Sequence, residues 1–331
     1  MKSIFIFTPS FHVHGGIRVI LEWANRLSEK HRVYLHSLKK DHCNWFPLSP
    51  AVNVVADTMN LEGCDLMIIT SPHSIHYANV ERPVRKVIFL QMMEHYFRPG
   101  DAQWVDLCNR TYLSPLPLIS ISQWNIEEMC KRGRTGPTFY VGNGVNLDHF
   151  PISDTPKQMH PPSVLVEGWS PGNVTKDSER LGARVAARLK ARKKVRVLAY
   201  SALPLKGPFE DVPDVFIRNP SLVELNRLYE EATILIKATK MDARSCSPME
   251  AMTKGTVTVR AIMKGDDDLF DGENCLRCPY EEHTLYQQSL LLLEKYEKWK
   301  RLSDNCRLYV RTHNWDFWME RIERILWTEI N

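Results

Sequence analysis

The sequence predicts an α/β protein with two Rossmann-like, doubly wound domains and C-terminal helices. Three observations lead to this prediction. Segments typical of buried strands alternate with segments typical of helices. The length of 331 residues suits two domains of about 150 residues each. The interval 151–162 carries four prolines and no apolar period, which is typical of a linker.

The first predicted domain is 1–150. Its apolar run at 4–7 is typical of a buried strand, and apolar residues at helical spacing over 17–27 predict the helix that follows. Further strands are expected at 32–35, 52–55, 66–70, 86–90, 118–121 and 138–141. Loops and helices between them favour a parallel sheet covered on both faces.

The second predicted domain is 163–312. Strands are expected at 164–166, 195–199, 215–217, 233–238 and 256–259, and helices at 176–193, 221–231, 248–254, 281–310 and 314–329. The final segment, 313–331, is expected to pack back on the first domain. Because open α/β sheets bind ligands beyond the carboxyl ends of their strands, we expect the two domains to face a central ligand-binding cleft.

The composition indicates a globular protein and suggests the cellular compartment in which it functions. Hydrophobic residues make up 44% of the chain and charged residues 25%, as in ordinary globular proteins. No apolar run approaches the roughly 20 residues of a membrane span, and the N-terminus does not resemble a signal peptide. The eight cysteines have no framework spacing, so we expect reduced thiols and a cytoplasmic protein. Cys275 and Cys278 lack further ligands at zinc spacing, and we expect no metal.

The interval 233–275 carries the most informative pattern. Asp242 and Glu250 lie on either side of a predicted strand-to-helix turn, where Ser247 and Pro248 open the helix and Gly255 ends it. The first N–H groups of a helix bind anions. Carboxylates beside them suit a ligand with phosphate and hydroxyl groups, such as a nucleotide-sugar. The alternative is an ordinary loop acid and an acid stabilised by the helix dipole.

This interval resembles the signature of retaining glycosyltransferases of the GT-B fold, family 4 type, in which two acidic residues enclose seven others. Asp242 replaces the usual first Glu, and 243–245 replace the usual Gly-Phe-Gly. The resemblance extends over most of the chain. The segment "HGGIRVILEWANRL" is similar to the family's first glycine loop and helix, and "YVGNGVNLDHF" to its Asn-Gly-Val segment.

The resemblance implies a hexosyl or pentosyl transferase that is retaining, independent of metal and free of cofactors, with a nucleotide diphosphate-sugar, taken as a UDP-sugar, as donor. The implied catalytic residues are Lys176, Asp242, Glu250, Glu94 and His95. The implied donor-binding residues are Gly15, Gly16, Gly168, Lys176, Arg180, Arg244, Ser245, Cys246, Ser247 and Glu250. The implied acceptor-binding residues are His14, Gln91 and Asn143. In these roles Glu250 holds the ribose hydroxyls and Lys176 neutralises the leaving diphosphate.

Two departures from the family pattern concern the site. Trp169 stands where the family has an Arg for the diphosphate, so that Arg180, Arg184 or Arg244 would have to supply the cation. Gln91 stands at the usual position of a sugar-site His, which makes its neighbours Glu94 and His95 the candidates there.

The acceptor and the oligomeric state are left open by the sequence. A glycan or a lipid-linked glycan suits the family. A hydroxymethylated DNA base is the alternative, since the basic segments 131–134 and 176–196 could contact phosphates and Trp104, Trp124 or Phe97 could stack on an extruded base. A further alternative is a protein that binds a nucleotide-sugar or nucleic acid without catalysis.

Overall fold

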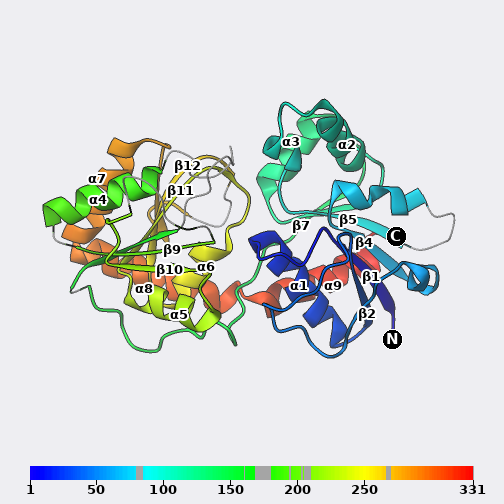
Figure 1. The fold of residues 1–331 in the computed structure, drawn as a ribbon, viewed down its shortest axis with the longest axis horizontal. Helices are drawn as coiled ribbons and strands as arrows, with labels where there is room; N and C mark the ends of the chain where they lie inside the picture. Colours follow the sequence, from blue (N-terminus) through cyan, green and yellow to red (C-terminus); the bar gives the residue numbers. More distant parts are fainter. Residues whose placement is uncertain are drawn as a thin grey trace. The chain divides into compact units, whose positions relative to one another are not determined.

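The structure is a computed structural model that describes residues 1–79, 85–159, 161–167, 180–193, 195–202, 204, 210–265 and 270–330. It divides into two compact units (Figure 1). The first comprises Met1–Gly142 and Met319–Asn331, and the second comprises Asn143–Trp318. Within the described ranges, no helix is long and apolar enough to cross a membrane.

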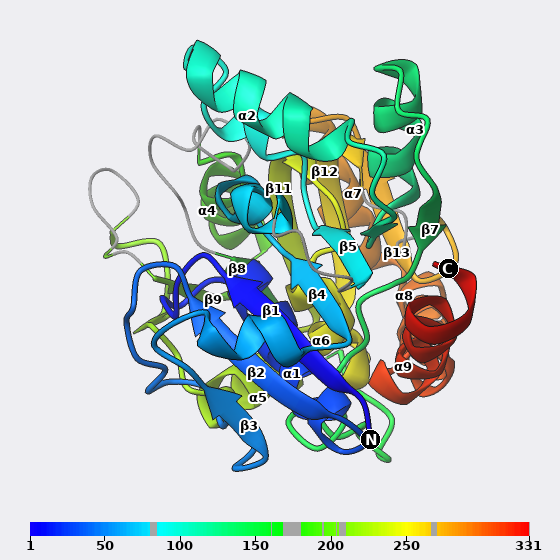
Figure 2. The ribbon, with the colours of Figure 1, turned by 90° about the vertical axis from the view of Figure 1, so that its right-hand side faces the viewer.

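The first unit is built on a parallel sheet of seven strands in the order β3-β2-β1-β4-β5-β6-β7, part of which is seen in Figure 2. The strands are β1 Ser3–Thr8, β2 Arg32–Ser37, β3 Val52–Val54, β4 Leu66–Ile69, β5 Arg85–Leu90, β6 Leu118–Ser120 and β7 Thr138–Tyr140. The α-helices are α1 Gly15–Ser28, α2 Ala102–Tyr112 and α3 Gln123–Lys131, and the 3-10 helices are η1 Met59–Gly63, η2 Pro72–Asn79 and η3 Glu94–Phe97. Strand order reverses between β1 and β4, so α1 begins at a topological switch point.

The C-terminal segment belongs partly to each unit. Helix α9, Trp315–Arg324, begins in the second unit and ends in the first, and the π-helical turn η4, Ile325–Glu329, follows it. In the first unit, Nε2 of His31 lies 3.0 Å from a carboxylate oxygen of Glu323, and the indole N–H of Trp327 donates to that carboxylate over 2.9 Å. These bonds attach the end of the chain to the first unit.

The second unit is built on a parallel sheet of six strands in the order β10-β9-β8-β11-β12-β13. The strands are β8 Ser163–Glu167, β9 Arg196–Ser201, β10 Val215–Arg218, β11 Ile234–Asp242, β12 Val257–Gly265 and β13 Cys275–Cys278. The helices are α4 Leu181–Lys193, α5 Leu222–Glu231, α6 Cys246–Thr253, α7 Glu282–Glu294 and α8 Tyr296–Thr312. Helices α4 and α7 cover one face, and α5, α6 and α8 cover the other (Figure 1).

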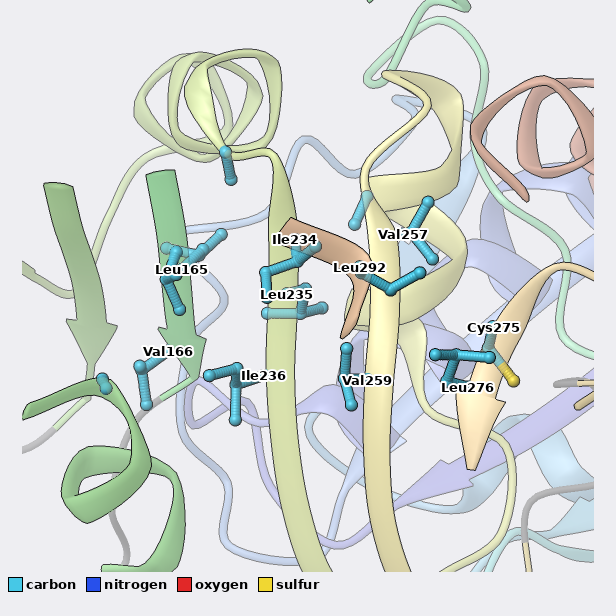
Figure 3. Packing of buried hydrophobic residues seen from close by; sticks show 14 of the residues in the cluster. Leu165, Val166, Ile234, Leu235, Ile236, Val257, Val259, Cys275, Leu276 and Leu292 are labelled. Atoms are coloured by element: carbon cyan, nitrogen blue, oxygen red, sulfur yellow. The ribbon is translucent and has the colours of Figure 1, made fainter. Parts of the chain in front are cut away.

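Branched apolar side chains of the central strands form the core of the second unit. Ile234 and Ile236 of β11 lie next to Val257 and Val259 of β12, and Leu292 of α7 packs beside them (Figure 3). Such residues suit a strand that is buried on both faces, which is why these apolar runs were recognisable in the sequence.

Lys157, in the proline-rich interval, is attached to this unit. Its ammonium donates to the carbonyl oxygens of Tyr229, Glu230 and Lys254 and to the hydroxyl of Thr256, over 2.7–3.2 Å. The carbonyl groups lie at the ends of α5 and α6, where the helix dipole favours a cation.

The prediction of two doubly wound α/β domains is confirmed, while several elements differ in extent. The helix expected at 281–310 is two helices, because Lys295 takes a non-helical conformation with φ −111° and ψ 82°. Strands β11 and β12 run on to Asp242 and Gly265, beyond the expected ends. Strand β13 was not predicted, since it is short and contains Arg277.

At two positions, the backbone geometry explains why the residue is glycine. Gly255 ends α6, as the sequence predicts, with a left-handed φ of 66°. Gly144, in the Asn-Gly-Val segment, lies against the backbone of Trp315, so that a Cβ there would overlap the Trp315 nitrogen. Only glycine allows this close approach of two backbone segments.

Candidate functional site

The candidate site lies at the carboxyl edge of the second sheet. Strand order reverses between β8 and β11, and ligands of open α/β sheets bind beyond the carboxyl ends of strands at such a switch point. Glu167 is the last residue of β8, Asp242 is the last residue of β11, and α6 begins four residues further on at Cys246.

The N-terminus of α6 has no side-chain cap. Ser245 occupies the N-cap position and makes no capping bond. The third helical residue is Pro248, which has no N–H to donate to the Ser245 hydroxyl. This hydroxyl instead donates to the carboxylate of Asp242 over 2.5 Å. The sequence placed Pro248 at the first helical position; in the structure the helix starts earlier, at Cys246. Ser245 therefore makes no capping hydrogen bond to the first turn of α6, and backbone N–H groups at the start of a helix suit an anion.

Asp242 is paired with a buried arginine. Nη2 of Arg260, on β12, lies 3.3 Å from Oδ2 of Asp242, and the Arg260 side chain is fully buried. A guanidinium taken out of water needs such a counter-charge. Asp242 is thus held by a cation on one side and by the Ser245 hydroxyl on the other.

Glu167 is held in the same way. The buried ammonium of Lys237, on β11, forms an ion pair with the Glu167 carboxylate and donates to the Ser247 hydroxyl over 2.8 Å. The Ser247 hydroxyl donates in turn to Glu167 over 2.5 Å. Each of the two strand-end carboxylates therefore contacts one serine of α6 and one buried cation.

These charged residues form a transverse row across the sheet. The strand register pairs Tyr200 with Glu167, Lys237 with Arg260, and Arg260 with Arg277. The ion pair of Glu167 and Lys237 joins the two halves of the row. Residues in register on parallel strands point to the same face, so the row is continuous.

Glu250 lies at the end of a buried hydrogen-bond chain. The Tyr229 hydroxyl donates to its carboxylate over 3.1 Å, and the Tyr200 hydroxyl lies 3.3 Å from that of Tyr229. Burial, together with the nearby carboxylates, raises the pKa of both tyrosines well above the usual value, so both stay neutral donors. Glu250 is 3% exposed, and Tyr229 orients its carboxylate.

Two of the arginines considered for the diphosphate are engaged elsewhere in the second unit. Arg244 is buried; its Nε donates to the Asn143 carbonyl over 3.1 Å, and its guanidinium lies 4.9 Å from the centre of the Trp318 ring. The Asn143 amide donates back to the Arg244 carbonyl over 3.3 Å. Arg184 forms an ion pair of 2.8 Å with Glu282. These contacts show structural uses for Arg244, Asn143 and Arg184.

Several predicted residues fall outside the described part of the chain. They are Gly168, Trp169, Lys176 and the acidic run 266–268. Arg180 is described; it directly precedes α4 and has a positive φ of 56°. In the described ranges, no three or more His, Cys, Asp or Glu side chains gather as they would around a metal ion.

In the first unit, the predicted residues around α1 come together. His14 is the N-cap of α1, and its Nδ1 accepts from the Gly16 N–H over 3.2 Å. The Gln91 amide, at the end of β5, donates to the Gly16 carbonyl over 3.0 Å, and Asn125 donates to the Gln91 carbonyl over 3.3 Å. Gly15 is exposed beside them. His14, Gly15, Gly16 and Gln91 thus form one cluster at the first switch point.

Glu94 and His95 are engaged within the first unit. The Tyr112 hydroxyl donates to the Glu94 carboxylate over 2.9 Å, and burial raises the pKa of Glu94 to about 7. His95 is buried; its Nε2 lies 2.8 Å from Nη2 of Arg132. Burial and the Arg132 charge lower the pKa of His95 to about 4, so its ring is neutral and accepts this bond.

Many cations of the two basic segments are paired within their own unit. Arg134 is buried and donates to the carbonyl oxygens of Tyr112, Ser114, Leu116 and Pro137. The further ion pairs are Lys131 with Glu128, Lys190 with Asp214, Lys193 with Glu294, and Arg196 with Glu231. The carboxylates offset the charges of these four cations, while the carbonyl groups around Arg134 satisfy its N–H groups without cancelling its charge.

Known proteins resemble this chain in structure. No protein-family model matches the sequence, and no curated protein matches it. A sucrose-phosphate synthase from Thermosynechococcus elongatus superposes with a TM-score of 0.76 at 13% identity, covering 99% of this chain and 100% of that one. HepE from Anabaena, in complex with UDP-glucose, superposes with a TM-score of 0.71 at 14% identity, covering 98% and 99%.

A glycosyltransferase from Rickettsia africae gives a TM-score of 0.69 at 13% identity, covering 99% of this chain and 98% of that one. The chain has the GT-B fold. The GT-B architecture extends over both units, since the superpositions include nearly the whole chain.

Three residues of the second unit that shape the site were not predicted from the sequence: Glu167, Lys237 and Arg260. A usable signal was present. Lys237 interrupts the apolar run 234–238, and Arg260 interrupts 257–262. A charge inside a central strand requires a buried partner, and Glu167 at the end of the neighbouring strand is such a partner for Lys237.

Proposed function

We propose that the protein is a retaining, metal-independent glycosyltransferase that transfers a sugar from a UDP-sugar to a hydroxyl group of a glycan or lipid-linked glycan. The observation that carries the proposal is the N-terminus of α6 at the switch point, where Ser245 makes no capping bond, with Asp242 before it and Glu250 within the helix. The fold supports it, since HepE, which shares the fold, was captured with UDP-glucose.

The chemistry follows from these groups. The N–H groups at the start of α6 hold diphosphate oxygens, and Glu250, oriented by Tyr229, accepts hydrogen bonds from the ribose. Asp242 accepts from a hydroxyl of the sugar. Lys176 adds a cation to the diphosphate, as the family resemblance implies.

The reaction exchanges one bond at the anomeric carbon for another. The bond to the diphosphate oxygen breaks, and the acceptor oxygen bonds to the same face of the sugar. The acceptor proton passes to the leaving diphosphate, on which negative charge accumulates. Stabilising that charge is the main catalytic requirement, and preorganised N–H groups and cations meet it.

A glycan hydroxyl is proposed as the acceptor in preference to a DNA base. DNA binding requires cations that are available to neutralise phosphates. In the basic helix α4, Arg184, Lys190 and Lys193 each lie in an ion pair with a carboxylate of the second unit.

A transfer assay tests the proposal. Purified protein is incubated with UDP-sugars, with and without glycan acceptors, and UDP release is measured. Slow hydrolysis of one donor, accelerated by an acceptor, is expected. If calorimetry detects no binding of UDP, the proposal fails. Binding without hydrolysis or transfer would instead favour a non-catalytic binding protein.

A further inference from the structure

Two serines at the start of α6 each donate a hydrogen bond to a strand-end carboxylate. Ser245 donates to Asp242 and Ser247 to Glu167, both over 2.5 Å. Two negative charges therefore lie beside a helix N-terminus that would otherwise attract anions. Taken alone, these carboxylates would oppose the binding of a phosphate.

A buried cation on the neighbouring strand offsets each carboxylate. Lys237 pairs with Glu167 and Arg260 with Asp242, and the exposed fractions of the two cationic side chains are 4% and 0%. Cations buried this deeply do not reach a ligand themselves. Their effect on a ligand passes through the carboxylates, and for Lys237 also through Ser247, the second residue of α6.

We propose that Lys237 is a positioning residue for the diphosphate of the donor. It cancels the charge of Glu167 and fixes the Ser247 side chain, so that the start of α6 keeps a net attraction for phosphate. This inference rests on the proposed function, because it takes a nucleoside diphosphate as the ligand. Glu167 is a charge partner of Lys237 here and makes no contact with the donor.

The Glu167→Gln variant gives the sharpest test. Its amide still accepts from Ser247 and Lys237 while the negative charge is lost, so the hydrogen-bond geometry should be kept even though the lost counter-charge of Lys237 lowers the stability. Without that charge, the start of α6 repels phosphate less, and UDP should bind about 3-fold or more tightly in calorimetry. Uridine, which has no phosphate, should bind unchanged. Glu294→Gln is the matched control, since Glu294 pairs with Lys193 at the end of α4 remote from the carboxyl edge.

The Lys237→Met variant should change UDP affinity in the opposite direction. It removes the cation that pairs with Glu167 beside the phosphate site, so UDP affinity should fall about 10-fold while uridine affinity is kept. The double variant Lys237→Met/Glu167→Gln should regain most of the UDP affinity. A merely structural role of Lys237 would not produce this rescue.

The outcomes separate the two proposals. Weaker UDP binding by Glu167→Gln overturns the inference and makes Glu167 a ligand contact. Equal losses of UDP and uridine in Lys237→Met, without rescue, also overturn it. Absence of UDP binding by the wild-type protein overturns the proposed function, and this inference with it.

Discussion

Lys237 on β11 and Arg260 on β12 are direct neighbours in the register of the second sheet. Two buried cations side by side repel each other, and their stability depends on Glu167 and Asp242, with which they pair. The charges therefore form two pairs that fix both carboxylates next to α6.

Removing one of these cations should destabilise the folded protein. Arg260→Met should lower the free energy of unfolding by about 3–5 kcal/mol, because a half-buried carboxylate loses its counter-charge. Urea unfolding measures the change. Arg260→Met/Asp242→Asn should recover part of the loss. Arg277→Met is the control, since Arg277 is only half-buried; a loss equal to that of Arg260→Met would argue against a special role for the buried pair.

Glu250→Ala should weaken the binding of UDP and of a UDP-sugar alike. A charged hydrogen bond to ribose exists in both complexes and contributes about 1.5–3 kcal/mol. Calorimetry with both ligands measures it, and Glu230→Ala, an exposed change on α5, is the control. Unchanged affinity for UDP in a folded Glu250→Ala protein would remove Glu250 from the site.

Chelation should leave transfer nearly intact. The proposed diphosphate contacts are N–H groups of α6 and Lys176, which need no metal ion. UDP release is measured in EDTA and in EDTA with excess Mg²⁺ or Mn²⁺. Activity that EDTA abolishes and metal restores would direct attention to the acidic run 266–268.

Glu94 should make stability depend on pH. Burial raises its pKa from 4.5 to about 7, so between these values the folded state binds a proton that the unfolded state has lost. The contribution of this group is fully present below pH 4.5 and is lost as the pH rises through 7, by up to about 3 kcal/mol. Urea unfolding of Glu94→Gln should lack this decline between pH 5 and pH 8. The exposed Glu29→Gln variant should behave as wild type does; identical slopes in all three proteins would contradict the assignment.

The protein should not bind duplex DNA. Each neutralised phosphate adds about 0.9 to the slope of log affinity against log salt, and Lys190 and Lys193 of α4 are held in ion pairs with carboxylates that compete with such contacts. A gel-shift titration at low and moderate salt measures this. Retardation at low salt with a steep salt dependence would favour the DNA alternative, and Lys193→Glu would then be expected to flatten the slope.

The sequence by itself determined most of the fold. Runs such as 4–7 and 233–238 combine β-branched and apolar residues, and the separation of these runs by helical periods is a local property that predicts parallel strands. Gly255 was recognisable as the end of α6 for the same local reason. Strand β13 and the break at Lys295 escaped prediction because neither has a strong local pattern.

The candidate site could be predicted only in part. The positions of Asp242 and Glu250 around the start of α6 followed from spacing, although α6 begins two residues earlier than predicted. The family resemblance, rather than the spacing, singled out His14, Gly16 and Gln91. Strand order and register are long-range properties of the folded chain, and they brought Glu167 to Lys237 and Arg260 to Asp242. Such pairs join residues from separate parts of the chain, so they cannot be predicted from local spacing in the sequence. Tertiary structure alone therefore decided which charges cancel at the N-terminus of α6.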